Sequence, residues 1–345
     1  MMGIPRIDDL LIATSQGVFA FRRGSLNCIH HGFGSYPGIS WDEKFVYLAA
    51  RRDHRIPVIE GTQNVLVLDP DFNWVGSIQG LKFVDLHQIY FYDGRLFICN
   101  TGMERIEIIE KETMDRVGII ERKRNGMSPH RFDYSVSRWD YSIVGQDLKH
   151  INSIWIDGGM VYIVEHRGGP SKVKYFNEKH EFLGEVDIGE KCHNVYVEDG
   201  KLFVCSSEAE CIIIRDLSTG KDRIINTSQY VEGFPRGLAR TLDRWYIGIS
   251  QRGTRDERHL PEGLGSVLVF DDDFRLIKRI VLENVGQVLD IRAMTGLDRA
   301  HNGIPFPAPA HDQARAIRFL RSAVFIGTPL HKRLVRRSEL NQGKP

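Results

Sequence analysis

The 345-residue chain lacks every segment that would mark a membrane protein or a secreted precursor. No apolar run approaches the roughly 18–20 residues that a membrane-spanning helix needs. The first residues, MMGIPRIDDLLIATS, do not combine a basic segment with an apolar stretch, so we expect no secretory signal. An excess of one charge is also missing, because 46 basic residues face 45 acidic ones. We therefore expect a protein that binds neither membranes nor nucleic acids.

Cysteine is scarce and shows no paired spacing. The chain has five cysteines, an odd number, and no CxxC motif. We therefore predict a cytoplasmic protein with reduced thiols. These are Cys28, Cys99, Cys192, Cys205 and Cys211.

The contiguous motifs of several large enzyme classes are absent as well. The sequence contains no GxSxG nucleophile elbow, no phosphate-binding P-loop and no dinucleotide fingerprint after a strand. Any catalytic site must therefore be assembled from residues that lie far apart in the sequence.

The chain does contain a repeated sequence motif. A polar residue opens a strand, an Asp-Gly turn follows, and a second strand returns. The clearest copies are HQIYFYDGRLFIC from His87, HINSIWIDGGMVYIV from His150, CHNVYVEDGKLFVC from Cys192 and PRGLARTLDRWYIGIS from Pro235. The turn aspartates, at intervals of 51, 64, 42 and 44 residues, are Asp42, Asp93, Asp157, Asp199 and Asp243. Repetition at about 40–50 residues, with only strands inside each unit, is typical of propeller blades.

This repeat predicts an all-β fold, a six-bladed β-propeller over residues 8–295. The six innermost strands are expected to begin near Gly38, His87, His150, His193, Arg236 and Val288. The last of these has no partners after it, whereas three strand-like segments at the amino terminus (DDLLIATS, GVFAFRRG and SLNCIHH) have none before them. We predict that strands from both chain ends form the last blade together, which removes exposed sheet edges.

Two segments interrupt the repeat. Residues 296–345 are expected to form a C-terminal extension, with a Pro-rich link and short helices, that packs on the propeller or on a second subunit of a homo-oligomer. Residues 122–147 form a long insertion at the entry to the third blade. In a propeller this insertion lies on the same face as the openings of the innermost strands, so we expect a site on that face.

The strand openings bring a set of histidines to the propeller axis. His87 and His193 each stand six residues before their turn aspartate, and His150 stands seven before its own. Three imidazoles in a water-accessible funnel suit a divalent metal ion such as Zn, Fe or Mn. The neighbouring amides of Gln88, Asn152 and Asn194 would instead suit Ca²⁺. A dry ring of histidines and amides that bind inter-blade backbone is the structural alternative.

Further residues on the same face suit an anionic substrate and proton transfer. Arg236 opens the fifth blade and Arg252 lies in a face-forming loop, where guanidinium groups can pair with carboxylate or phosphate. Tyr36, Asn152 and Asn194 are also candidate substrate-binding residues. His166 and Asp290 are the candidate catalytic acid and base.

In these features the chain resembles a superfamily of six-bladed propellers. It includes the gluconolactonase-like lactonases, strictosidine synthase-like proteins and NHL-repeat proteins. The resemblance covers about residues 10–295 and rests on the Asp-Gly repeat and the polar strand openings. It implies the propeller fold and, as in the lactonases, an axial divalent ion held by Glu, Asn and Asp, with Asn152 and Asn194 at the amide positions. The histidines are not part of the lactonase pattern, and no specific family is assigned.

The leading hypothesis is a metal-assisted enzyme acting on a small anionic or sugar-like molecule by hydrolysis, elimination or isomerisation. His87, His150 and His193 would hold the ion, and Arg236 would bind an acidic group of the substrate. An iron-dependent propeller oxygenase is the second hypothesis. A non-catalytic propeller that binds a ligand or another protein is the third.

Overall fold

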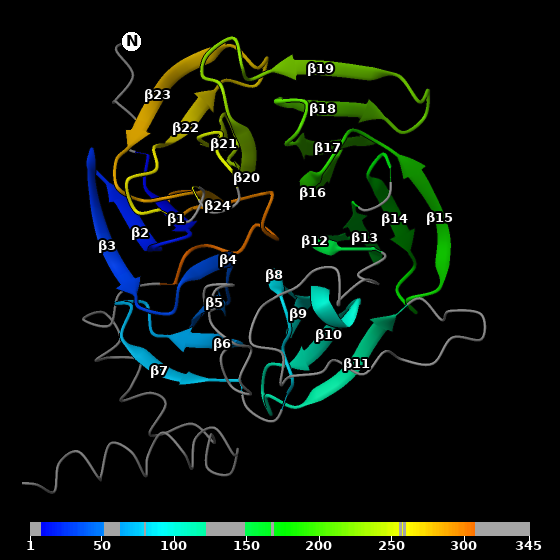
Figure 1. Cartoon of the computed structure of the whole chain (residues 1–345). Coiled ribbons are helices and arrows are strands. Elements are labelled where there is room, and N and C mark those ends of the chain that lie inside the picture. The colour runs from blue at the N-terminus through cyan, green and yellow to red at the C-terminus, as the bar shows by residue number, and fades with distance from the viewer. Residues whose placement is uncertain are drawn as a thin grey trace, which may run out of the picture.

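Six four-stranded antiparallel sheets surround a central axis, as Figure 1 shows. This computed structural model describes residues 8–51, 63–78, 81–121, 149–166, 169–254, 257 and 260–307. The predicted all-β, six-bladed β-propeller is confirmed. The insertion at 122–147 and the predicted helices after residue 307 lie outside the described residues.

Five blades each take four consecutive strands, from the axis outward. Blade 1 contains β4 (Ser35–Trp41), β5 (Val46–Arg51), β6 (Gln63–Leu68) and β7 (Trp74–Ser77). Blade 2 contains β8 (Leu86–Tyr92), β9 (Arg95–Asn100), β10 (Arg105–Glu110) and β11 (Arg116–Glu121), with the 3-10 turn η1 (Thr101–Met103) after β9. Blade 3 contains β12 (Ile151–Asp157), β13 (Met160–Glu165), β14 (Lys172–Phe176) and β15 (Phe182–Asp187). Blade 4 contains β16 (Cys192–Glu198), β17 (Lys201–Ser206), β18 (Cys211–Asp216) and β19 (Asp222–Asn226), and blade 5 contains β20 (Phe234–Arg240), β21 (Trp245–Ser250), β22 (Gly265–Phe270) and β23 (Leu276–Leu282).

Strands from both chain ends build blade 6. Its innermost strand is β24 (Val288–Ala293), followed outward by β1 (Leu10–Thr14), β2 (Gly17–Arg22) and β3 (Ser25–His31). β24 pairs antiparallel with β1, with Ile12 opposite Ile291. The predicted closure is therefore confirmed, and Figure 1 shows β24 and β1 side by side.

Burial decreases from the axis outward. Every residue of β4 is buried, whereas the outermost β15 alternates between exposed and half-buried positions. Because both faces of the inner strands pack against neighbouring blades, even polar residues of these strands, such as Ser40, Gln88 and Asp290, are buried. All five cysteines are free thiols, and four of them are buried.

The hairpins between the first and second strands of blades 2, 3 and 4 use left-handed turns. In blade 2 the turn residues Asp93 and Gly94 have φ values of 47° and 73°. In blade 3 the two turn residues are Gly158 and Gly159, with φ values of 53° and 78°. Two-residue turns of this kind match the right-handed twist of the strands. The turn of blade 3 therefore does not contain Asp157, which instead ends β12.

This difference explains the offset of His150 in the sequence repeat. The hairpin of blade 2 closes on Tyr92 and that of blade 3 on Asp157, so these two residues are equivalent. Counted back from them, His150 occupies the position of Asp85 rather than that of His87. His150 and Asp85 share a left-handed conformation, with φ values of 46° and 51°.

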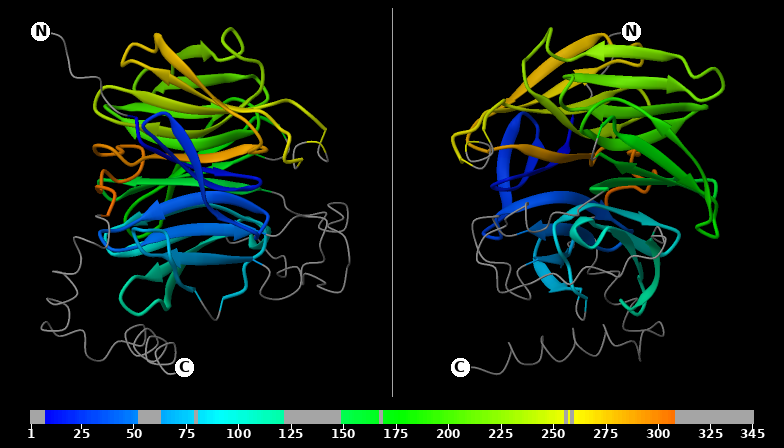
Figure 2. Two further views of the ribbon diagram at one scale, coloured as in Figure 1. Left: turned by 90° about the vertical axis from the view of Figure 1, so that its left-hand side faces the viewer. Right: turned by 45° about the vertical axis from the view of Figure 1, so that its right-hand side comes forward.

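The two faces of the propeller differ in what covers them. We call the face where the inner strands begin the entry face, and the face with their hairpin turns the turn face. Figure 2 shows residues 295–307 (orange) on the side opposite the loop that joins β21 to β22 (yellow). The segment 295–307 therefore lies on the turn face.

Specific hydrogen bonds hold this segment against the inner strands. The Asp298 carboxylate accepts hydrogen bonds from the backbone N–H of Arg240, Ala293 and Ala300 at 2.9–3.1 Å. The indole N–H of Trp41 donates to the carbonyl of Ile304 at 3.0 Å. The segment thus caps the axis at the turn face. No helix in the described part of the chain is long and apolar enough to cross a membrane.

Candidate functional site: an axial histidine cluster

Four imidazole rings lie in a row on the entry face. The ring centroids of His87 and His150 are 4.9 Å apart, those of His150 and His166 4.2 Å, and those of His166 and His193 5.2 Å. His87 and His193 enter from β8 and β16, while His150 precedes β12 and His166 follows β13. The row therefore brings together residues of blades 2, 3 and 4, as the repeat predicted.

The hydrogen bonds of His87 fix which ring nitrogen carries the proton. Its Nδ1 lies 3.0 Å from the backbone carbonyl of Asp85 and 2.9 Å from the Thr101 hydroxyl. The Thr101 hydroxyl donates its own proton to the carbonyl of Ile151. Both neighbours of Nδ1 are therefore acceptors, so Nδ1 carries the proton and Nε2 holds a lone pair.

His193 is arranged in the same way. Its Nδ1 lies 2.9 Å from the hydroxyl of Ser207, which follows β17. That hydroxyl donates to the backbone carbonyl of Pro235 at 2.8 Å. The Ser207 oxygen must therefore accept from Nδ1–H, which leaves the Nε2 lone pair of His193 available. Metal-binding histidines are usually oriented by a hydrogen bond of this type.

The third member of the closest donor group is a carboxylate. Donor atoms of Asp85, His87 and His150 all lie within 4.8 Å of one another, which no other trio of His, Cys, Asp or Glu achieves in the described ranges. Asp85 also forms an ion pair with Arg51. The predicted ligands His87 and His150 are thus brought together, whereas His193 lies at the other end of the row.

Sequence reasoning missed Asp85 because it precedes the strand and was not aligned with His150. A signal was present in the sequence: counting back from the residue that closes each hairpin, Tyr92 and Asp157, places Asp85 and His150 in one column. The difference between an Asp-Gly turn and a Gly-Gly turn concealed that equivalence.

Burial and neighbouring charges determine the protonation of the cluster. Burial, helped by Arg236, keeps the pKa of His193 well below its usual range, and burial also lowers the pKa of His166 to about 2. Burial lowers the pKa of His87 strongly, although the Asp85 carboxylate opposes that shift. Burial alone would raise the pKa of Asp85, but Arg51 and the imidazoles outweigh it and the pKa is lowered. At neutral pH the imidazoles of His87, His166 and His193 are therefore neutral, and the Asp85 carboxylate is charged.

His166 has the least satisfied of these rings. Its Nε2 is buried and has no hydrogen-bond partner among the described residues. The ring lies between those of His150 and His193. An orphaned polar atom at this point fits a bound ion, water or substrate.

The amide groups next to the cluster bind the backbone of the following blade. The Gln88 side chain accepts from Ile154 N–H at 2.9 Å. Asn152 donates to the Cys192 carbonyl at 2.8 Å, and the Asn194 side chain accepts from Gly237 N–H at 2.7 Å. These contacts are the inter-blade hydrogen bonds of the structural alternative, so the amide groups of Asn152 and Asn194 are engaged between blades.

Asp290 closes this ring from β24. Its side chain is fully buried, and it accepts from the backbone N–H of Ile39 and Ile291 at 3.0 and 3.1 Å. It also contacts the guanidinium of Arg292 at 3.1 Å, and Arg292 donates to carbonyls of β4 and β20. We call Asp290 and Arg292 the central ion pair. Burial raises the pKa of Asp290 despite Arg292 beside it.

Of the remaining predicted site residues, one lies near the histidine cluster and two have their contacts elsewhere. Arg236 is close enough to the imidazoles to lower the pKa of His193, after the larger effect of burial. Tyr36 is fully buried, and its hydroxyl contacts His30 Nδ1 at 2.9 Å. Arg252 forms an ion pair with Glu210 while half of its side chain is exposed. The structure thus brings Arg236 to the cluster, while the partners of Tyr36 and Arg252 lie elsewhere.

Comparison with known proteins supports the fold and goes no further. No protein-family model and no curated protein match the sequence. A crystal structure of a protein of unknown function from Bacteroides caccae is similar, with a TM-score of 0.57 at 11% identity, over 83% of this chain and 98% of that one. A crystal structure of a nidogen/laminin complex is similar with a TM-score of 0.56, also at 11% identity, over 82% of this chain and 97% of that one. At such low identity the likeness shows a shared propeller architecture.

Proposed function

We propose that this protein is a metal-assisted enzyme whose axial histidine cluster acts on a small anionic or sugar-like molecule. The observation that carries the proposal is the pair of oriented imidazoles, His87 and His193, whose Nδ1 atoms are occupied and whose Nε2 lone pairs are available.

The donor set favours a borderline transition metal. Neutral imidazole nitrogens with one nearby carboxylate suit Zn, Fe or Mn better than Ca²⁺, which prefers oxygen ligands. We propose that Asp85, His87 and His150, whose donor atoms lie within 4.8 Å of one another, hold the ion. His193 lies outside this group, next to His166, and we propose that it approaches the ion as a further ligand when the metal binds. A metal bound there would polarise a substrate oxygen or activate a water molecule.

Arg236 and His166 are the proposed partners of the substrate. Arg236 contributes a positive charge at the edge of the cluster, which suits a carboxylate or phosphate group. His166 is neutral and its buried Nε2 lacks a partner in the described residues, so it is available to exchange a proton with bound substrate. Asp290 is less suited to this role, because Ile39, Ile291 and Arg292 already engage its carboxylate.

An iron-dependent oxygenase is the second candidate. The observation that favours it is again the donor set, because several neutral imidazoles in one cluster bind iron as well as zinc. Metal preference and oxygen uptake by the iron-loaded protein distinguish this function from hydrolysis, elimination or isomerisation.

Elemental analysis tests the proposal. We expect about one equivalent of a transition metal in purified protein after dialysis against Zn²⁺ or Fe²⁺. His87→Ala and His193→Ala should each lower the metal content several-fold, because one ligand is lost. His31→Ala, at an exposed position in the outer strand β3, is the matched control. Folded protein without metal, or equal loss in the control, would support a non-catalytic binding propeller instead.

A further inference from the structure

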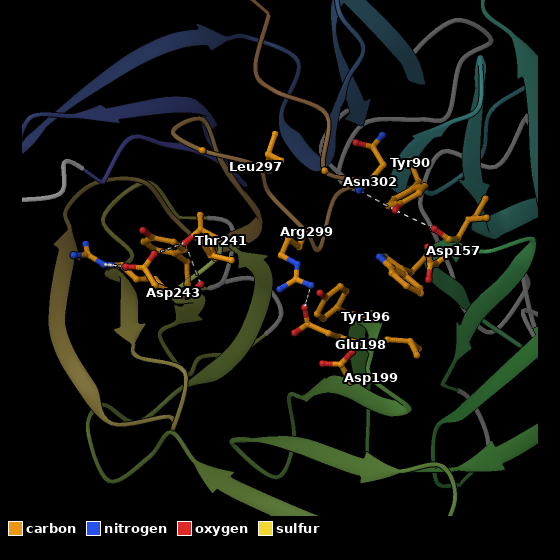
Figure 3. Close-up of a pocket in the computed structure, with 18 of the residues that line it drawn as sticks. Tyr90, Asp157, Tyr196, Glu198, Asp199, Thr241, Asp243, Leu297, Arg299 and Asn302 are labelled. Carbon is orange, nitrogen blue, oxygen red and sulfur yellow. Dashed lines mark hydrogen bonds and ion pairs between the residues drawn. The ribbon is translucent and has the colours of Figure 1, made fainter.

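A second concavity lies at the opposite end of the axis, on the turn face. It has a volume of about 1110 Å³ and is bounded by the hairpin turns of blades 3, 4 and 5 and by residues 295–303. Figure 3 shows the segment carrying Leu297, Arg299 and Asn302 across from Asp157, at the end of β12, and from the turns that carry Asp199 and Asp243. The sequence analysis placed no site on this face. A cavity of this size is in the range of small-molecule binding sites.

The lining of the cavity combines aromatic rings with carboxylates. The aromatic residues are Tyr90, Tyr92, Trp155, Tyr196 and Tyr246. Asp157 and Asp199 stand at its rim, and both are exposed. Neither carboxylate has an ion pair or hydrogen bond within the described residues. Electron-rich ring faces and unpaired carboxylates attract the same ligand chemistry, an organic cation.

The protein itself places a cation of this type in the cavity. The guanidinium of Arg299 lies 2.6 Å from the carboxylate of Glu198, as Figure 3 shows. Glu198 and Arg299 both line the cavity, and 42% of the Arg299 side chain is exposed. Below it, the guanidinium of Arg240 lies 4.6 Å from the ring centroid of Trp245. These contacts demonstrate how guanidinium groups are accommodated here.

Trp155 supplies an independent indication of a ligand. It lines the cavity and is 96% buried, since its exposure is 4%. Its indole N–H is buried and has no acceptor in the part of the chain that the structure describes. An indole N–H only donates, so a ligand that satisfies it must carry an acceptor such as a carbonyl oxygen.

We propose that this cavity binds an organic cation of the guanidinium or ammonium type that also carries a hydrogen-bond acceptor. Asp157 and Asp199 would pair with the cationic group, and Trp155 would donate to the acceptor. An arginine or lysine residue next to a peptide carbonyl has both features. The cavity lies at the turn ends of the inner strands and the histidine cluster at their opposite ends, so the two sites are separate and this inference does not depend on the proposed function.

Calorimetric titration with Nα-acetyl-arginine amide tests this assignment. Its uncharged comparison is Nα-acetyl-citrulline amide, which has nearly the same shape and the same carbonyl groups. We expect the citrulline compound to bind at least about tenfold more weakly. Agmatine, which has the guanidinium group but no carbonyl, tests the acceptor that Trp155 would bind. We expect agmatine to bind more weakly than the arginine compound, and equal binding would overturn the role of Trp155.

A pair of matched variants tests the role of the carboxylates. The double variant Asp157→Asn and Asp199→Asn should weaken binding of the arginine compound about tenfold, because each exposed pair contributes up to about 1 kcal/mol. Asp93→Asn is the control: Asp93 occupies the same turn position as Asp199, with φ values of 47° and 50°, and does not line the cavity. Asparagine tolerates this left-handed conformation, so all variants should fold. Equal binding of the citrulline compound, an equal loss in Asp93→Asn, or no binding up to about 10 mM would overturn the proposal.

Discussion

The two ends of the propeller axis are both built from residues of the inner strands and their flanking turns, but the side chains at the two ends differ in type and charge. At the entry face, the strand openings place neutral imidazoles beside arginine side chains. At the turn face, the ends of the same strands place tyrosines and the exposed carboxylates of Asp157 and Asp199 around a cavity. The central ion pair, within β24, lies between these two ends. A repeated scaffold can therefore carry two independent sites, because the two ends of each inner strand never meet.

The largest expected effect concerns the central ion pair that separates the two ends. Asp290→Ala leaves the guanidinium of the fully buried Arg292 without its counter-ion. We expect the free energy of unfolding to fall by about 3–5 kcal/mol. Urea titration followed by tryptophan fluorescence measures this loss. The exposed Asp273→Ala should change stability by less than about 0.5 kcal/mol. A loss below about 1 kcal/mol for Asp290→Ala would contradict the role assigned to this pair.

The attachment of residues 295–307 should depend on pH. Burial raises the pKa of Asp298 to about 6, although Arg292 opposes the shift, and the unfolded value is near 3.8. The folded state therefore takes up a proton first as pH falls, so Asp298 adds stability between pH 6 and pH 4 and loses it as pH rises. Asp298→Asn does not titrate and should cost about 2 kcal/mol at pH 7, where one backbone N–H loses its acceptor.

Urea unfolding of both proteins at pH 4.5 and pH 7 measures this dependence. Other titrating groups cancel in the difference between wild type and variant. We expect the difference to be larger at pH 4.5 by on the order of 2 kcal/mol. A difference that stays constant, or shrinks at the lower pH, would contradict the shifted pKa of Asp298.

The hydroxyls that orient the imidazoles should affect metal binding without affecting the turn face. Ser207→Ala removes the hydroxyl that accepts from His193 Nδ1–H, whereas Thr101→Val leaves the carbonyl of Asp85 as the acceptor for His87 Nδ1–H. We expect metal affinity to fall about 10- to 100-fold for Ser207→Ala and less for Thr101→Val. Competition with a chromophoric chelator measures both. Unchanged affinity in Ser207→Ala would show that the orientation of His193 does not serve a metal.

The smallest expected effects are those of replacing Arg252 and Arg236, the two arginines predicted for the entry face, and they should differ in substrate binding. Arg252→Ala removes an ion pair that is half exposed, so stability should change by at most about 1 kcal/mol. Oxalate binding to the cobalt-loaded protein, followed by its visible spectrum, should not change. Arg236→Ala should weaken oxalate binding several-fold, because Arg236 stands beside the imidazoles. Equal responses of the two variants would remove Arg236 from the proposed substrate site.

The fold could be predicted from the sequence because the repeat reflects structural requirements that recur in the blades. Blades 2, 3 and 4 combine a buried first strand with a left-handed two-residue turn, so glycine-containing turns recur there at blade spacing. The closure of blade 6 followed from counting unpaired strands, and β24 beside β1 confirms it. The convergence of His87 and His150 on the axis followed from their places at the openings of inner strands, although the two residues occupy different positions of the repeat.

The rest depends on local geometry that the repeat does not encode. A Gly-Gly turn in blade 3 shifts the alignment by one residue, which hid the equivalence of Asp85 and His150. The hydroxyl of Tyr36 contacts His30 rather than the axial histidines, because its side chain packs in the core between blades. The cavity on the turn face depends on residues 295–303, which follow the last blade and belong to no repeat.

X-ray absorption spectroscopy of the zinc-loaded protein tests the central claim most directly. Imidazole ligands give zinc–nitrogen distances of about 2.0–2.1 Å and a distinctive multiple-scattering pattern from the ring. The account predicts two or three imidazoles per zinc in wild type, and one fewer in His87→Ala. A zinc shell without imidazole, or one unchanged by His87→Ala, would contradict it.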